Sequence, residues 1–324
     1  MKAPPRLAAA WAALCLTACA ASLGAPRPAP MIATGWTPAT AELKRVGLGL
    51  PGGAALAPNV RFAGGIEIVA DAASPLHSLS DLKLTGDGGF VTVSDGGDLV
   101  RGRLRLDETG RLVGVDGLAF RRLTLTDGSP IADKADGDAE GLALTPSGDV
   151  LVSFERRHRI WNYGALAALR DRPAPVPSPD HPFTENEGME GLSAAPDGWR
   201  AAGEDGGVWD CTPRACDVVA APPSTPVTDG DFRTTGLDRD PSGDGWFAVQ
   251  RRFRPPLDVR AQVRRMGRDG ALGPVLVELK LPGTTDNFEG VAAEARNGAT
   301  RLYILSDDNL NPMQRTLLLA FDIR

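Results

Sequence analysis

The sequence predicts an all-β protein, a β-propeller in which five blades are countable and a sixth remains open. A hairpin pattern recurs along the chain, with starts at residues 81, 141, 191, 236 and 290. Periods of about 40 to 60 residues are typical of propellers and other repeat architectures. The composition, with 38 glycines and 27 prolines among 324 residues, is typical of short strands joined by tight turns. Long amphipathic helix patterns are hard to find.

Each repeat joins two alternating apolar runs through a turn of small and polar residues, such as PSGD at 146–149. Such turns contain residues that tolerate positive φ, as a β-hairpin requires. The starts lie 45 to 60 residues apart, which leaves room for about four short strands per blade. We expect the early run at 60–69 to pair with the last run at 317–323, because closing the ring removes exposed sheet edges.

The N-terminus has the pattern of an export signal. Lys2 and Arg6 precede an apolar run that ends in LTAC at 16–19, so we predict a lipoprotein signal peptide at 1–18 and lipidation of Cys19. An ordinary secretory cleavage with an incidental Cys19 is the alternative. A tether rich in Pro, Ala and Gly is predicted at 19–58, and the propeller domain at 59–324. Because Ala20 follows the cysteine, we expect a periplasmic protein at the outer membrane, touching the membrane only through its lipid anchor.

The cysteines and the net charge indicate the redox compartment and the kinds of partner that the protein can have. In an oxidising compartment Cys211 and Cys216 are predicted to form a disulfide, and two unbonded thiols or a metal site are the alternatives. The formal net charge is −6 and the basic residues form no stripe, which argues against a nucleic-acid partner. We expect a monomer whose partner is a small molecule or an envelope ligand.

The repeat gives its acidic residues a special position. A hairpin returns the chain to the face where it began, so the start of the first strand and the end of the second share one mouth of the channel. The acids at these positions are Asp81, Asp95, Glu140, Glu155, Glu190, Glu204 or Asp205, Glu289 and Asp307. So many carboxylates around one axis repel each other unless a cation, ion pairs or protonation compensates them. Acids in the hairpin turns, such as Asp149 and Asp244, are turn formers on the opposite face.

The ways in which this repulsion can be compensated predict a role for each charged residue. The predicted metal ligands are Asp81, Glu140, Glu190 and Glu289, with Ca²⁺ as the candidate ion because it prefers oxygen ligands. The predicted catalytic groups are Asp95, Glu155 and Asp307, and the predicted substrate-binding groups are Arg156, Arg251 and Arg252. For any single acid the alternative is a structural tie to turn amides of the neighbouring blade, and the glycine of the Glu-Gly pairs serves close packing in the same interpretation.

Absent motifs exclude several reaction classes. The chain has no Gly-x-Ser-x-Gly elbow, no His-Glu-x-x-His, no phosphate-cradling loop and no dinucleotide fingerprint. His77, His158 and His181 lie in different repeats without ligand spacing, which argues against a zinc site.

Eight motifs in order resemble the phytase-like family, named for an esterase-like activity of phytase. They are GGIEI at 64–68, SLSDL at 78–82, VSDGG at 93–97, DAEGL at 138–142, SFER at 153–156, EGMEGL at 187–192, NFEGV at 287–291 and LSDDN at 305–309. The resemblance covers residues 60 to 323 and implies a periplasmic propeller with phosphoester or ester hydrolysis. The family pattern Ser-Asp-Arg-Gly is Ser-Asp-Gly-Gly at 94–97, which removes a phosphate-binding arginine at that position.

Two functional hypotheses remain. The first is metal-assisted hydrolysis of a phosphoester or another small anionic ester at the acidic mouth. The second is a tethered propeller without catalysis, which presents this face to an envelope ligand.

Overall fold

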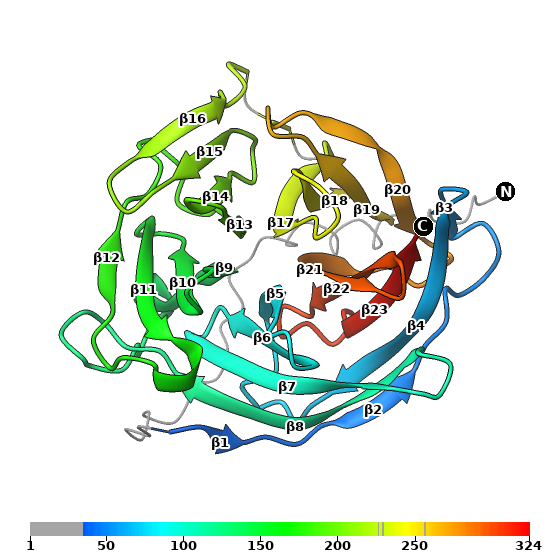
Figure 1. Ribbon diagram of the computed structural model, residues 1–324. Coiled ribbons are helices and arrows are strands. Elements are labelled where there is room, and N and C mark those ends of the chain that lie inside the picture. The colour runs from blue at the N-terminus through cyan, green and yellow to red at the C-terminus, as the bar shows by residue number, and fades with distance from the viewer. Residues whose placement is uncertain (1–34, 226, 229, 256) are drawn as a thin grey trace, which may run out of the picture.

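The computed structural model describes residues 35–324 except 226, 229 and 256 (Figure 1). The predicted signal peptide, Cys19 and the first part of the predicted tether lie outside the described residues. The regular secondary structure of the described chain is almost entirely strand, and the strands surround a central axis, so the predicted all-β propeller is confirmed. Helical turns in the described part are α1 (Lys134–Gly137) and the 3-10 turn η1 (Leu166–Ala168).

The described strands pair into four sheets of ten, four, four and five strands. The ten-stranded sheet contains two antiparallel runs of four strands that meet at one parallel bridge between β4 and β8, so we describe the strands as five units. Unit 1 is β5 (Leu79–Leu84), β6 (Gly89–Ser94), β7 (Asp98–Leu106) and β8 (Leu112–Arg122). Unit 2 is β9 (Ala139–Leu144), β10 (Asp149–Phe154), β11 (Arg159–Ala165) and β12 (Ala174–Val176). Unit 3 is β13 (Gly191–Ala195), β14 (Gly198–Ala202), β15 (Val208–Cys211) and β16 (Cys216–Ala220). Unit 4 is β17 (Arg233–Arg239), β18 (Trp246–Arg254), β19 (Asp258–Met266) and β20 (Leu272–Lys280). Unit 5 is β21 (Asn287–Arg296), β22 (Ala299–Asp307), β23 (Thr316–Ile323) and β4 (Val60–Val69).

Unit 5 closes the ring as predicted. β23, the last strand, pairs antiparallel with β4, which comes from the N-terminal side of unit 1, with Leu318 opposite Ile66. The two chain segments are joined further by reciprocal hydrogen bonds, because the Arg324 amide donates to the Asn59 carbonyl and the Asn59 side chain donates to the Arg324 carbonyl. Closure through the two ends of the domain leaves no open edge at this point of the ring.

The tether predicted up to residue 58 is too long. Three short strands fall inside it: β1 (Thr37–Pro38), β2 (Glu42–Arg45) and β3 (Ala54–Leu56). They pair with β8, β4 and β20 respectively. Among the described residues of this segment, Pro38 ends β1 and Pro51 and Pro58 lie in turns, where a missing amide donor costs little. The segment from residue 37 therefore belongs to the propeller.

The hydrophobic core consists of five layers, each between two neighbouring units. Phe247 of unit 4 packs with Phe288 and Leu319 of unit 5, for example, and Val93 of unit 1 packs with Val152 of unit 2. The other layers lie between units 5 and 1, 2 and 3, and 3 and 4. Because every unit is covered on both faces, the strands are apolar on both sides rather than strictly alternating.

The inner strands β5, β9, β13, β17 and β21 contact one another in a ring around the axis (Figure 1). Two glycines show why this approach needs the Gly of the repeated motif. A Cβ on Gly236 would lie 2.3 Å from the carbonyl oxygen of Glu289, and one on Gly290 would lie 2.7 Å from the backbone of Asp81. The close packing that the sequence left as an alternative for the Glu-Gly pairs is therefore present at Gly290, and Gly236, which follows Thr235, packs in the same way.

Cys211 and Cys216 form a disulfide between the paired strands β15 and β16, where they stand opposite each other in the register. None of the helices in the described residues is long and apolar enough to cross a membrane.

Candidate functional site

The strand register brings the acidic positions to one end of the channel. Phe154 pairs with Ala139, and beyond this pair the Glu155 amide donates to the Asp138 carbonyl at 2.8 Å. Asn287 likewise pairs with Asp307 in unit 5. The start of each inner strand and the end of the next strand therefore share one face, which we call the acidic mouth.

A first group of charged residues, the Lys134 cluster, consists of Lys134 and three acids, Asp95, Asp138 and Glu140. Oxygens of the three acids lie within 4.8 Å of one another. Lys134 Nζ is 2.7 Å from Asp95 Oδ2 and 2.9 Å from Asp138 Oδ1, so one ammonium group bridges two carboxylates. The short helix α1 carries this lysine, and Asp133 caps it by accepting from the Asp136 amide. Arg156 Nε adds a contact of 2.6 Å to Asp138 Oδ2.

A second group, the three-glutamate cluster, consists of Glu155, Glu190 and Glu204. These residues follow β10, precede β13 and follow β14, so the cluster joins units 2 and 3. Oxygens of the three acids lie within 4.8 Å of one another, and each residue is at most 6% exposed. Glu155 Oε1 and Glu190 Oε2 are buried without a hydrogen-bond partner among the described residues. Buried polar atoms are almost always paired, so these two oxygens are suited to accept a hydrogen bond from a ligand or to bind a cation.

Arg251 connects the three-glutamate cluster to unit 5. Its Nη2 lies 3.2 Å from Glu204 Oε1, and its Nε lies 3.5 Å from Glu289 Oε1. Glu289 also accepts hydrogen bonds from Ser80 Oγ at 3.0 Å and from Asn287 Nδ2 at 2.7 Å. Asp307, only 2% exposed, accepts from the Asn309 amide at 2.6 Å. The acids of the mouth are therefore interspersed with cations, among them Lys134, Arg156 and Arg251.

Burial and mutual repulsion raise the pKa of the acids in the mouth. Burial, followed by the negative charges of Asp138 and Glu204, raises the pKa of Glu155 to about 8. Burial also raises the pKa of Glu289 to about 7, although Arg251 lowers it. The pKa of Glu140 rises well above its ordinary value through burial and then through Asp95 and Glu155. These carboxyls hold protons near neutral pH unless a cation replaces those protons.

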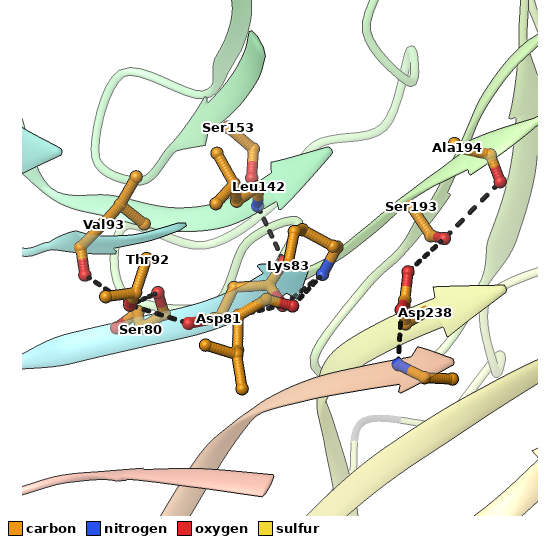
Figure 2. Close-up of polar contacts among 12 residues, drawn as sticks. Ser80, Asp81, Lys83, Thr92, Val93, Leu142, Ser153, Ser193, Ala194 and Asp238 are labelled. Atoms are coloured by element: carbon orange, nitrogen blue, oxygen red, sulfur yellow. Dashed lines mark hydrogen bonds and ion pairs between the residues drawn. The ribbon is translucent and has the colours of Figure 1, made fainter. Parts of the chain in front are cut away.

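Asp81, a predicted metal ligand, does not belong to the mouth. Its side chain is fully buried, and Lys83 Nζ and the Leu82 amide donate to its Oδ1 (Figure 2). Its Oδ2 accepts from the Leu142 amide of β9 at 2.7 Å. A register shift between Ser80 and Lys83 and a φ of 53° at Asp81 turn the carboxylate toward the neighbouring inner strand. The prediction for Asp81 is wrong in this structure, where the residue ties two units together.

Arg252, a predicted substrate-binding group, is also misplaced. Its Nη2 lies 3.0 Å from Asp258 Oδ2, and its guanidinium lies 4.8 Å from the centre of the Phe232 ring. Successive side chains of a strand point to opposite faces, so Arg251 in the mouth places Arg252 on the other side of β18. Arg156 and Arg251, the other two predicted substrate-binding arginines, lie at the mouth.

A family model described as phytase-like, with an esterase-like activity of phytase, matches residues 74–310. The chain belongs to this phytase-like family. No curated protein matches the sequence. Among solved structures it is similar to a putative gluconolactonase, with 16% identity, a TM-score of 0.46 and coverage of 89% of this chain and 95% of that one. It is also similar to the PQQ-bound aldose sugar dehydrogenase of Streptomyces coelicolor, with 14% identity, a TM-score of 0.43 and coverage of 89% and 99%.

Sequence reasoning missed several residues that this phytase-like protein places at the mouth. Lys134 lies between two repeats, in a segment that the hairpin pattern does not cover. Asp138 stands two residues before Glu140 in the same motif, so its proximity could have been inferred from the register. Arg233 Nη1 contacts Glu187 at 2.7 Å, Asp205 at 2.8 Å and Glu204 at 3.4 Å. Of the two acids that the hairpin rule left open, Glu204 belongs to the three-glutamate cluster.

The raised pKa values predict how the stability of this phytase-like protein, freed of metal, depends on pH. The pKa of Glu155 is about 8 in the folded state against an ordinary 4.5, so between these values the folded chain holds a proton that the unfolded chain has released. Stability is therefore expected to fall as pH rises from about 5 to about 8. Thermal melts in EDTA measure this, with Glu155→Gln expected to show a shallower decline. A melting temperature that stays constant or rises over this range in both proteins contradicts the prediction.

Proposed function

We propose that the acidic mouth is the active site of a metal-assisted hydrolase acting on a phosphoester or another small anionic ester. The observation that carries the proposal is the pair of buried glutamate oxygens, Glu155 Oε1 and Glu190 Oε2, that lack a hydrogen-bond partner in the described structure. The family description, esterase-like activity of phytase, agrees with this reaction class.

The three-glutamate cluster fits a hard cation such as Ca²⁺. Three carboxylates from different strand ends offer oxygen atoms within 4.8 Å of one another, and Ca²⁺ is bound by oxygen ligands. A bound cation of this kind would polarise the ester oxygen and lower the pKa of a coordinated water. Glu155, Glu190 and Glu204 are therefore the proposed ligands, in place of the sequence-based set of Asp81, Glu140, Glu190 and Glu289.

Glu140 is the proposed proton carrier. The residue is half-buried, and its pKa is raised first by burial and then by Asp95 of the Lys134 cluster and Glu155 of the three-glutamate cluster. A protonated carboxyl next to a metal site can donate to the oxygen of a leaving group and later accept a proton from water. Asp95 is less suited, because Lys134 Nζ holds its Oδ2 at 2.7 Å. Asp307 is only 2% exposed and thus less accessible to a substrate.

Two arginines are placed to hold the anionic part of a substrate. The side chains of Arg156 and Arg251 are 28% and 32% exposed, so their remaining donors reach the mouth. Their present partners, Asp138 and Glu204, hold them by ion pairs and orient the guanidinium groups. A guanidinium favours planar, bidentate recognition of phosphate and carboxylate oxygens.

The proposed setting is the periplasm, with the chain anchored to the outer membrane through lipid at Cys19. This setting rests on the sequence pattern at 16–19. It is consistent with the Cys211–Cys216 disulfide, which persists in an oxidising compartment.

A substrate panel tests the proposal. The purified mature protein is expected to hydrolyse at least one of p-nitrophenyl phosphate, bis-p-nitrophenyl phosphate and short-chain p-nitrophenyl esters when Ca²⁺ or Mg²⁺ is present. Addition of EDTA is expected to remove most of this turnover, and replenished Ca²⁺ to restore it. Absence of turnover on the whole panel with either ion contradicts a hydrolase and favours the alternative, an envelope-tethered binding propeller.

A further inference from the structure

The exposed apolar side chains gather at one end of the propeller. Eight large apolar side chains are exposed in the described part of the chain, and six of them lie at the end that carries the acidic mouth. We call these six the apolar rim: Leu50, Phe253, Leu257, Leu281, Leu310 and Met313. The other two are Val218 on β16 and Val275 on β20. Single exposed apolar residues are ordinary in soluble proteins, whereas a gathered set marks a surface for a partner or a membrane.

The tip of the β18–β19 hairpin extends beyond the rest of unit 4. The inner strand β17 begins opposite Arg251, while β18 and β19 stay paired as far as Arg254 and Asp258. Phe253 and Leu257 therefore lie outward of the first residue of the inner strand. Leu257 is 68% exposed, so this tip presents its apolar side chain to the surroundings.

Two further turns bring apolar side chains to the same rim. Leu281 follows β20 directly, and a backbone bridge between nearby residues holds the turn of Leu50 against it. Leu310 and Met313 lie in the turn between β22 and β23, in unit 5. Arg315, near the end of this turn, donates to a backbone carbonyl in the segment that follows Leu281. The turns are therefore connected along the mouth end of units 4 and 5.

The N-terminal segment enters the domain from the same end. Thr37 of β1 pairs with Phe120 of β8. β8 runs toward the mouth, because its last residue, Arg122, pairs with Asp98, which follows the turn that begins at Asp95. β1 is antiparallel to β8, so the chain runs through β1 away from the mouth. The residues that precede β1 are therefore attached to the domain at its mouth end.

The predicted lipid anchor at Cys19 is separated from the first described residue, Gly35, by residues 20–34. A fully extended chain of this length spans at most about 55 Å. An anchor on so short a segment keeps the domain beside the bilayer and gives the apolar rim a high effective concentration there. The lipid surface is therefore the partner that this rim meets first.

We propose that the apolar rim docks on a phospholipid bilayer, with its three turns in the headgroup region and units 4 and 5 next to the membrane. The proposal rests on the proposed lipid anchor at Cys19 and not on hydrolysis at the mouth. The contact is made by apolar side chains, so it does not require anionic lipid, and the formal net charge of −6 does not favour an anionic surface. Neutral phosphatidylcholine is therefore a sufficient surface.

Fluorescence quenching on the full chain, expressed with its export signal and reconstituted into phosphatidylcholine vesicles, tests the contact. The fluorophore NBD is attached to one introduced cysteine at a time, in Leu257→Cys, Met313→Cys, Val218→Cys and Val275→Cys. The first two labelled proteins are expected to lose about half or more of their emission when the lipid carries a nitroxide near its headgroup, because docking buries the turns about 5–10 Å deep. The Val218 and Val275 variants are matched controls outside the rim, and we expect them to keep their emission.

A charge in the rim separates contact by the rim from contact by the label. With the label at Met313, Leu257→Asp is expected to reduce the quenching, because a carboxylate at the tip opposes burial in lipid. Val218→Asp with the same label is expected to leave the quenching unchanged.

Flotation of the vesicles on a density gradient measures the anchor separately. Protein that floats with the vesicles but shows no quenching at Leu257 and Met313 overturns the docking and leaves the anchor in place. Equal quenching at all four labelled positions overturns the docking as well, because the rim is then no closer to the lipid than other surfaces. Protein that does not float contradicts the anchor and overturns the docking with it.

Discussion

Glu140→Gln is expected to lower kcat on the best ester substrate by about 10²- to 10⁴-fold, the usual contribution of a positioned general acid or base. The amide has nearly the shape of the carboxyl but cannot exchange a proton at neutral pH. KM is expected to change little, because the anion is held by Arg156 and Arg251 rather than by this side chain. Steady-state kinetics on the wild type and the variant measure both parameters.

The melting temperature of the Glu140→Gln variant is a second measurement on this residue. Burial and the negative charges of Asp95 and Glu155 disfavour the ionised form of this carboxyl, so an uncharged amide in its place is expected to preserve or raise the melting temperature in EDTA. Asp244→Asn is the matched control, since it changes an exposed acid to its amide in a hairpin turn at the opposite face. A Glu140→Gln protein that keeps wild-type kcat shows that the proton carrier is another group.

Arg200→Met is expected to reduce the free energy of unfolding by about 3 kcal/mol or more. Arg200 is 1% exposed and donates to both oxygens of Asp210, at 2.7 and 2.8 Å. It also donates to the carbonyls of Gly267 and Arg268 in unit 4, and its guanidinium lies 3.7 Å from the centre of the Trp246 ring. Methionine fills much of the space but leaves these acceptors without their donor.

Urea unfolding of Arg200→Met and of Arg103→Met measures the difference. Arg103 pairs with Asp87, and both side chains are more than half exposed, so its loss is expected to cost less than about 1 kcal/mol. Equal stability losses in the two variants contradict the view that Arg200 joins units 3 and 4.

The hairpin repeat predicted the positions of most acids in the mouth, because the register of a hairpin determines which residues share a face. Glu155, Glu190 and Glu289 follow from that rule alone. The rule does not predict which of these acids lie closest together, because the distances between acids of different units depend on how the blades pack. Asp81 shows this limit, because a local register shift turns it into a tie between β5 and β9. Arg252 was misplaced for a simpler reason, since strand alternation assigns it to the face opposite Arg251.

The hairpin pattern predicts nothing about the positions of residues outside the repeat. Lys134 reaches Asp95 and Asp138 from a single helical turn between β8 and β9, and no periodicity marks it. The segment from residue 37 to 56 was assigned to a tether because prolines interrupt it. Its strands are only two to four residues long, too short to show alternation, and their role depends on partners far away in the sequence.

The most direct test of the cation site is the melting temperature of the metal-free protein during a Ca²⁺ titration, for the wild type and for Glu190→Gln. A ligand that binds only the folded state stabilises it by about 2.7 kcal/mol at a concentration of 100 Kd. The wild type is therefore expected to show a saturable rise with Ca²⁺, and Glu190→Gln a much smaller one, while Asp244→Asn rises like the wild type. A wild-type melting temperature that does not change with Ca²⁺, or an equal rise in Glu190→Gln, contradicts a cation bound by the three-glutamate cluster.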